Sequence, residues 1–227
     1  RRVLFRSLGA ILFNNLYWLF GFLRVSTTGY AAQAFGAADR ELGTLAFFKP
    51  LVLALLISLA CIVFQKPILE SYLAMIGAAP EVNALCREYY YILIWGAPLV
   101  LGNYVALGWL MGQTRVRASV FMQVSMNVLN MALSIWFVFG LHMDIVGVAF
   151  ATLLSQLYGG VISVVLMYYY GEFDYKNLPW GELLDWRTFI GMLKVNVNLM
   201  IRTACLLTVN NIIAAVGASF GTVVLAA

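Results

Sequence analysis

The chain has 227 residues, of which 63% are hydrophobic and only 11% are charged, and its mean hydropathy is +0.89. Soluble domains usually contain about 45–50% apolar and about 25% charged residues, so this composition excludes a soluble enzyme. The formal charge of +4 comes from basic residues spread thinly along the chain, without the clustering that is typical of a nucleic-acid-binding surface.

Apolar stretches long enough to cross a bilayer recur along the whole chain, since a spanning helix needs about 20 mostly apolar residues. Six such stretches are present, at 8–35, 44–64, 89–111, 118–139, 145–170 and 189–215. The connections between them are 36–43, 65–88, 113–117, 140–144 and 171–188. The sequence has no alternating segments of the length of barrel strands, and helices satisfy every backbone group in lipid. We therefore predict an all-α polytopic transmembrane helical bundle.

Basic residues are unevenly shared between the two sides of this bundle. The first, third and fifth connections with their helix ends hold seven, which are Arg40, Lys49, Arg115, Arg117, Lys176, Arg187 and Lys194. The second and fourth connections hold two, Lys66 and Arg87. Short loops rich in Lys and Arg stay in the cytoplasm, so the odd-numbered connections are predicted to be cytoplasmic.

The first residues, RRVLFRS, contradict this sidedness, because Arg1, Arg2 and Arg6 fall on the opposite side. Two interpretations are open: a local exception, or the loss of a preceding span. The sequence begins without Met and shows no signal-peptide pattern, which favours the second. We expect the chain to be a piece of a longer membrane protein.

Four polar residues share one face of the fourth stretch, because they are spaced by four, three and four positions. They are Gln123, Asn127, Asn130 and Ser134. One interpretation is a set of interhelical hydrogen bonds, each worth about 1 kcal/mol in lipid. The other is the wall of a water-accessible cavity, and the spacing alone does not separate the two.

Small residues recur every fourth position in the fifth stretch, at Gly147, Ala151, Ser155, Gly159 and Ser163. This period lets helix backbones approach closely, so we interpret it as a packing ridge rather than a binding site. Thr152 and Gln156 lie beside the ridge, where they can turn toward the polar face of the fourth stretch.

Two arginines fall inside predicted spans, Arg24 in the first and Arg202 in the sixth. A charge at membrane depth needs a partner or water, so each is a candidate functional charge. The alternative is a structural role, with each guanidinium hydrogen-bonded to backbone carbonyls at a helix end.

No cofactor or metal site is predicted. Cys61, Cys86 and Cys205 are isolated, and a solvated pair is the simpler interpretation of His142 and Asp144. All ten acidic residues fall in connections or at span ends, whereas a proton-driven transporter normally has a carboxylate or histidine within the membrane.

Three segments resemble the multidrug and toxic compound extrusion (MATE) family, most of all its branch named after DNA-damage-inducible protein F. They are GFLRVSTTGYAAQAFGAADRE (21–41), YYYILIWGAPLVLGNYVALGWLMGQTRVR (89–117) and NVLNMALSIWFVFGLHMDIVGVAFATLLSQ (127–156). The resemblance implies a transporter of twelve helices in two lobes around a central cleft, of which this chain covers about the second to seventh helices. It implies an N-terminal lobe at 1–170, a cytoplasmic inter-lobe loop at 171–188 and the start of the C-terminal lobe at 189–227.

The resemblance also assigns residues to a cavity that binds substrate or cation. Asn103, Asn130 and Thr152 match polar positions of the family's N-terminal lobe, which makes the face of Gln123, Asn127, Asn130 and Ser134 the cavity wall. Ser134 stands where the family has an Asp, so a coupling carboxylate is expected only in the first helix, which this chain lacks, or in the other lobe.

On this resemblance we expect a secondary active transporter in a bacterial inner membrane rather than an enzyme. It would export amphipathic or cationic organic compounds by alternating access, coupled to H⁺ or Na⁺ and without another cofactor. The expected partners are small organic substrates and the lipid bilayer, with no nucleic acid and no obligate protein partner. The alternatives are a lipid-linked precursor flippase of the same superfamily and, from another class, a membrane-embedded enzyme or receptor.

Overall fold

The computed structural model describes residues 20–76, 80–170, 181, 190–191, 194, 196–206 and 208–209. Throughout these residues the regular structure is helical, as predicted. The principal helices are α2 (Phe22–Gly36), α3 (Arg40–Val63), α4 (Gln65–Ile76), α5 (Pro80–Leu93), α6 (Ala97–Gly112), α7 (Val116–Ile135) and α8 (Asp144–Tyr170). A 3₁₀ turn, η1 (Ile94–Gly96), joins α5 to α6, and a π-helical turn, η2 (Trp136–Gly140), extends α7.

Four helical segments in the described part are long and apolar enough to cross a membrane: Arg40–Val63, Cys86–Gly112, Val116–Gly140 and Asp144–Tyr170. They match the second to fifth predicted spans. The first and sixth spans lie partly outside the described residues, as do most of the predicted inter-lobe loop and residues 1–19. The connection predicted at 65–88 is itself helical, and it forms α4 and most of α5.

Two prolines explain where this helical connection begins and where the third predicted span bends. Proline lacks an N–H and clashes with the carbonyl four residues earlier. Pro67 is four residues after Val63, the last residue of α3. Pro98 is four residues after Ile94, whose carbonyl instead accepts a hydrogen bond from Ala97 N, and this shorter bond makes the 3₁₀ turn η1.

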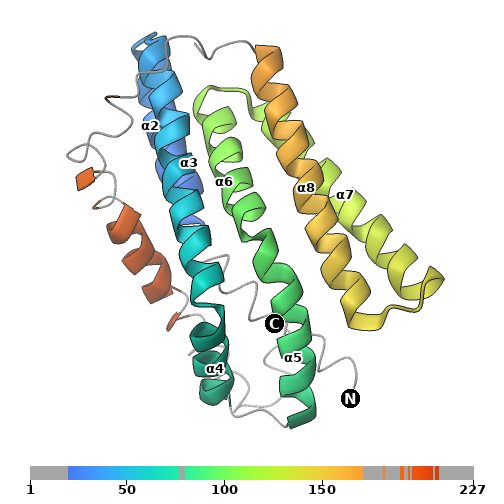
Figure 1. Cartoon of the computed structure of the whole chain (residues 1–227). Coiled ribbons are helices and arrows are strands. Elements are labelled where there is room, and N and C mark those ends of the chain that lie inside the picture. The colour runs from blue at the N-terminus through green and yellow to red at the C-terminus, as the bar shows by residue number, and fades with distance from the viewer. Residues whose placement is uncertain are drawn as a thin grey trace.

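Helix α6 is the centre of the bundle. Figure 1 shows it between the α2 and α3 pair on one side and the α7 and α8 pair on the other. It is buried along most of its length, which agrees with a helix that is apolar on every side. The helices on both sides are therefore positioned through their contacts with α6.

The contact between α2 and α6 depends on two glycines of α6. A methyl group added to Gly112 would lie 2.5 Å from the Cβ atom of Ala31 and 2.6 Å from the carbonyl oxygen of Thr28. One added to Gly108 would lie 2.5 Å from the carbonyl oxygen of Arg24. Since these contacts are shorter than a side chain tolerates and two of them are to backbone, only glycine allows this helix spacing.

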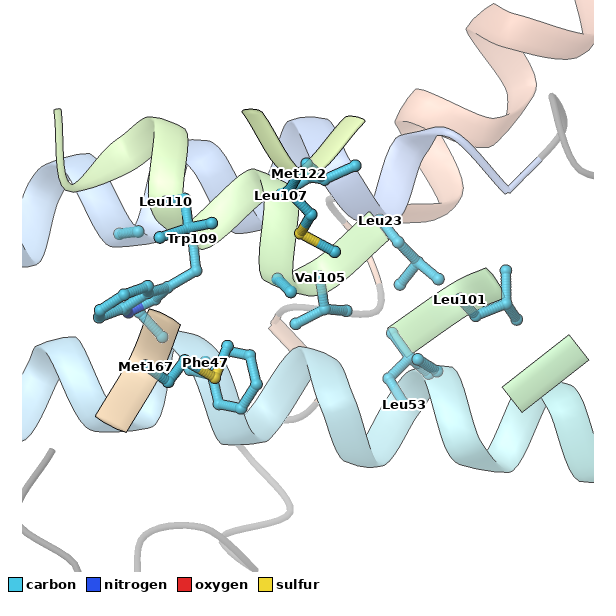
Figure 2. Packing of buried hydrophobic residues seen from close by; sticks show 14 of the residues in the cluster. Leu23, Phe47, Leu53, Leu101, Val105, Leu107, Trp109, Leu110, Met122 and Met167 are labelled. Carbon is cyan, nitrogen blue, oxygen red and sulfur yellow. The ribbon is translucent and has the colours of Figure 1, made fainter. Parts of the chain in front are cut away.

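Large side chains fill the remaining space around α6 (Figure 2). There, residues of α2, α3, α6, α7 and α8 form one hydrophobic cluster. Trp109 is 1% exposed, and its ring packs edge-to-face on Phe47 with 6.3 Å between centroids. Its indole Nε1 donates a hydrogen bond to the carbonyl oxygen of Gly43 at 3.1 Å. This polar group is thus satisfied inside an apolar core, as burial of a tryptophan requires.

Helices α2 and α6 end in the same way, with a Schellman motif. After α2, Ala38 N and Asp39 N donate to the carbonyls of Phe35 and Ala34. After α6, Thr114 N and Arg115 N donate to Met111 and Leu110. The residue in the left-handed conformation is Ala38 (φ 52°) or Thr114 (φ 59°), where glycine is the usual choice.

An ion pair joins α4 and α5 on the side predicted to face away from the cytoplasm. Arg87 donates two hydrogen bonds to the carboxylate of Glu70, of which the one to Oε2 measures 2.9 Å. These hydrogen bonds to Arg87 hold the pKa of the Glu70 carboxyl below its usual range. Both side chains are solvent-accessible, so the pair adds little to the stability of the bundle.

We expect Gly112→Ala to lower the free energy of unfolding by about 1–3 kcal/mol, because the added methyl group meets backbone that cannot move aside. Unfolding in detergent followed by circular dichroism measures the effect. Gly29→Ala on α2 is the matched control, since nothing lies within 4 Å of the Cβ atom it would add. Equal stability of the two variants would contradict the close approach.

Thr114→Gly is expected to raise the free energy of unfolding by about 1 kcal/mol, because it relieves a β-branched side chain of its left-handed backbone conformation. The same unfolding assay applies. Ala32→Gly, at an exposed helical position of α2, should instead lower it by about 1 kcal/mol. If both changes destabilise the protein, the left-handed cap is not a source of strain.

Candidate functional site

The packing ridge of α8 brings the candidate site residues together. All five ridge residues, Gly147, Ala151, Ser155, Gly159 and Ser163, are buried, which confirms the packing interpretation. A methyl group on Gly159 would lie 2.4 Å from Sδ of Met126 on α7 and 2.9 Å from Nδ2 of Asn103 on α6. Gly159 thus lies at the point where α6, α7 and α8 meet.

Asn103 holds α6 against α8. Its side chain is 3% exposed, and its Nδ2 donates to the backbone oxygen of Gln156 at 3.0 Å and to Oε1 of Gln156 at 2.9 Å. In the sequence Gln156 directly follows Ser155 of the α8 ridge, but its hydrogen bonds with Asn103 depend on the way α6 and α8 cross. Asn103 also lines a pocket of about 300 Å³ between α3, α6 and α8, whose wall is otherwise mostly apolar.

Asn130 makes the corresponding link between α7 and α8. Its Nδ2 lies 3.1 Å from Oγ1 of Thr152 and 3.1 Å from Oγ of Ser155. Both hydroxyls in turn donate to carbonyls of α8, Thr152 to Val148 and Ser155 to Thr152, so each acts as the acceptor for Asn130. The sequence interpretation placed Ser155 on the packing ridge alone and did not identify this second role.

The four polar residues of α7 divide into two pairs. Asn130 and Ser134 are half-buried, and Ser134 lines a separate pocket of about 380 Å³ with Tyr89 of α5 and Val148 of α8. Gln123 and Asn127 are exposed, and no hydrogen bond joins either to another described residue. Interhelical hydrogen bonding therefore accounts for Asn130 and leaves Gln123 and Asn127 presented at the surface of this part of the bundle.

The two arginines have different surroundings. Arg24 is half-buried, and its Nη2 donates to Sδ of Met111 at 3.2 Å, a weak acceptor that leaves most of the guanidinium donors unused. This partner is a side chain of α6, not a backbone carbonyl at a helix end as the structural alternative proposed. Arg202 is exposed, and within the described residues it has no ion-pair partner.

The described carboxylates lie at helix ends or in the outer connection. Asp39 caps α3 by accepting hydrogen bonds from Glu41 N at 2.9 Å and Leu42 N at 3.1 Å. In the described ranges no group of three or more His, Cys, Asp or Glu side chains is arranged to hold a metal. The site at the junction of α6, α7 and α8 is thus uncharged, built from amides and hydroxyls.

We expect Asn103→Ala and Gln156→Ala to be non-additive by about 0.6 kcal/mol or more, because they remove the two ends of one buried contact. Unfolding in detergent of the two single variants and the double variant measures this coupling. The pair Asn103→Ala and Asn127→Ala serves as the control and should be additive. Additivity of the first pair would show that the Asn103–Gln156 contact does not hold α6 to α8.

The sequence is similar to those of known proteins. The MatE family model matches residues 7–136. DNA damage-inducible protein F of Escherichia coli (strain K12) is 33% identical over 223 residues, which are 97% of this chain and 48% of that protein. The chain therefore spans about half the length of the curated relative it matches.

Solved structures share the fold. The crystal structure of a MATE in complex with MaD5 matches with a TM-score of 0.83 and 23% identity over 99% of this chain and 51% of that one. The inward-facing structure of a multidrug resistance MATE family transporter of the MOP superfamily matches with a TM-score of 0.74 and 24% identity. The match covers 88% of this chain and 46% of that one. The outward-facing structure of a multidrug resistance MATE family transporter of the same superfamily matches with a TM-score of 0.75 and 24% identity. The match covers 87% of this chain and 44% of that one. The architecture, the family model and the identity to the Escherichia coli protein together show that this chain belongs to the MatE family.

Proposed function

We propose that the protein containing this chain is a secondary active efflux transporter, a cation-coupled antiporter that exports amphipathic or cationic organic compounds by alternating access. The observation that carries the proposal is the exposed amide face of α7, formed by Gln123 and Asn127. It lies next to the hydrogen-bonded group of Asn130, Thr152 and Ser155.

Exposed amides within a membrane helix need water or another part of the protein, because lipid offers them no hydrogen-bond partner. A surface of α7 that carries both amides and apolar side chains such as Val124 and Val128, each more than half exposed, suits amphipathic molecules. Small-molecule sites are mostly apolar with a few placed polar groups, and this face has that character. We propose that it lines the cleft through which substrate passes.

The part of the N-terminal lobe formed by α2 to α8 is proposed to move as one body. It matches the inward-facing and the outward-facing MATE family structures almost equally, with TM-scores of 0.74 and 0.75. The close packing of α2, α6 and α8 at Gly108, Gly112 and Gly159 supports movement as one body, because tightly packed helices do not deform continuously. Alternating access would then come from movement of this part against the remainder.

Coupling to H⁺ or Na⁺ is proposed to involve an acid outside the described residues. On the resemblance described above, Ser134 stands where an Asp is expected, and a hydroxyl neither titrates near neutral pH nor neutralises a cation. The amide and hydroxyl oxygens of Asn130, Ser134 and Thr152 would supply hydrogen-bond support to that acid. The bilayer that holds the protein is proposed to be a bacterial inner membrane.

Asn127→Leu tests the cleft face. The change removes no described hydrogen bond, so folded abundance should stay the same while export of a cationic dye such as ethidium falls about tenfold. Val161→Leu, at an exposed position of α8 outside this face, is the control and should leave export unchanged, whereas Asn130→Ala should also reduce export. Dye efflux from cells and immunoblotting of membranes measure the two quantities. Normal export by both asparagine variants would refute the cavity assignment.

A further inference from the structure

A third pocket, separate from the junction of α6, α7 and α8, lies between α2 and α3 near the beginning of α3. Its volume is about 610 Å³. Gly191, from the described segment after the predicted inter-lobe loop, also borders it. The described residues that line it are Tyr30, Gln33, Ala34, Ala37, Leu42, Leu45, Ala46, Lys49, Pro50 and Gly191.

Lys49 distinguishes this pocket. Its side chain is only 8% exposed, and in the part of the chain that the structure describes it forms no ion pair and no hydrogen bond. An ammonium group on a side chain that is this largely enclosed favours an opposite charge or a hydrogen-bond acceptor beside it. Among the described residues that line the pocket there is no carboxylate, and the carboxylate of Asp39, at the start of α3, accepts hydrogen bonds from the first amides of that helix.

The polar groups around the pocket are suited to an anion. Besides the Lys49 ammonium, the lining carries the amide N–H₂ of Gln33 and the hydroxyl of Tyr30, both of which can donate hydrogen bonds. The remaining lining is apolar, with leucine, alanine and proline side chains. We propose that this pocket binds an amphipathic anion, with a single phosphate, sulfate or carboxylate head at Lys49 and an apolar body along α2 and α3.

The depth of Lys49 in the membrane agrees with such a ligand. It is nine residues after Arg40, the first residue of α3, but only five residues inside the span predicted at 44–64, which corresponds to about 8 Å along the helix. The sidedness predicted from the basic residues puts this end of α3 at the cytoplasmic surface, where anionic lipid headgroups concentrate. The head group can therefore belong to a phospholipid of that leaflet or to a soluble amphipathic anion taken up from the cytoplasm.

Binding to the purified protein tests the proposal without any transport measurement, so its outcome is independent of the efflux function proposed above. Native mass spectrometry in dodecyl maltoside would compare phosphatidylglycerol, zwitterionic phosphatidylethanolamine and monododecyl phosphate. Lys49→Met keeps an unbranched side chain, one atom shorter, and removes the charge. Lys66→Met, at an exposed position of α4, removes the same charge elsewhere and is the matched control.

Lys49→Met should weaken binding of at least one of the two anions about tenfold, as expected for loss of a charge-assisted hydrogen bond, and should leave phosphatidylethanolamine unchanged. Lys49→Arg keeps the charge and should retain binding of the anions. It provides the second test of the pocket if Lys49→Met does not fold. Dependence on Lys49 with phosphatidylglycerol identifies a lipid site, and dependence with monododecyl phosphate alone identifies a site for a soluble anion. Equal binding of both anions by the wild type, Lys49→Met and Lys66→Met would overturn the proposal.

Discussion

The close approach of α2 to α6 is the constraint on which the rest of this bundle depends. Gly108 and Gly112 bring the backbone of α6 against Arg24, Thr28 and Ala31, where even one methyl group would not fit. In a bilayer, helices gain little from burying apolar surface, so contact between backbones replaces it as the source of attraction. Helix α6, held in this way, carries Trp109 toward α3 and Asn103 toward α8.

Helix α8 repeats the principle with a hydrogen bond added at each side. The ridge is narrow enough at Gly159 to admit Met126 of α7 and Asn103 of α6. On either side an asparagine donates to it, Asn103 to Gln156 and Asn130 to Thr152 and Ser155. Because the polar contacts of Asn130 face α8, Gln123 and Asn127 on the same helix remain available to a ligand or to water.

The sequence predicted the parts of the fold that follow from hydropathy and helical period. Spans two to five follow from hydropathy, and the ridge of α8 and the polar face of α7 follow from the helical period. Both signals are reliable in a membrane because the bilayer requires its spanning segments to be helical. The helices α4 and α5 within the connection at 65–88 were not anticipated, since their polar content resembles a loop. Likewise the caps after α2 and α6 have Ala38 and Thr114 where glycine would have signalled them.

The site could be predicted only in part for a related reason. Which residues share a face of α7 follows from spacing, but which of them meet α8 depends on the crossing of two helices. The pairing of Asn103 with Gln156 joins positions 53 residues apart, and no local pattern encodes it. Lys49 was used only to establish sidedness, although a lysine placed next to Pro50 and inside a predicted span was itself a signal of unusual surroundings.

The exposed polar face of α7 has a consequence for how such a transporter can diversify. A substitution at Gly112 or Gly159 disturbs several helices at once, whereas one at Gln123 or Asn127 breaks no hydrogen bond among the described residues. Since most surface changes leave stability nearly unaltered, in the proposed transporter selection for new compounds could act on this face without loss of folded protein. Variants with altered substrate range should therefore accumulate along α7, while the α2–α6 contact stays free of change.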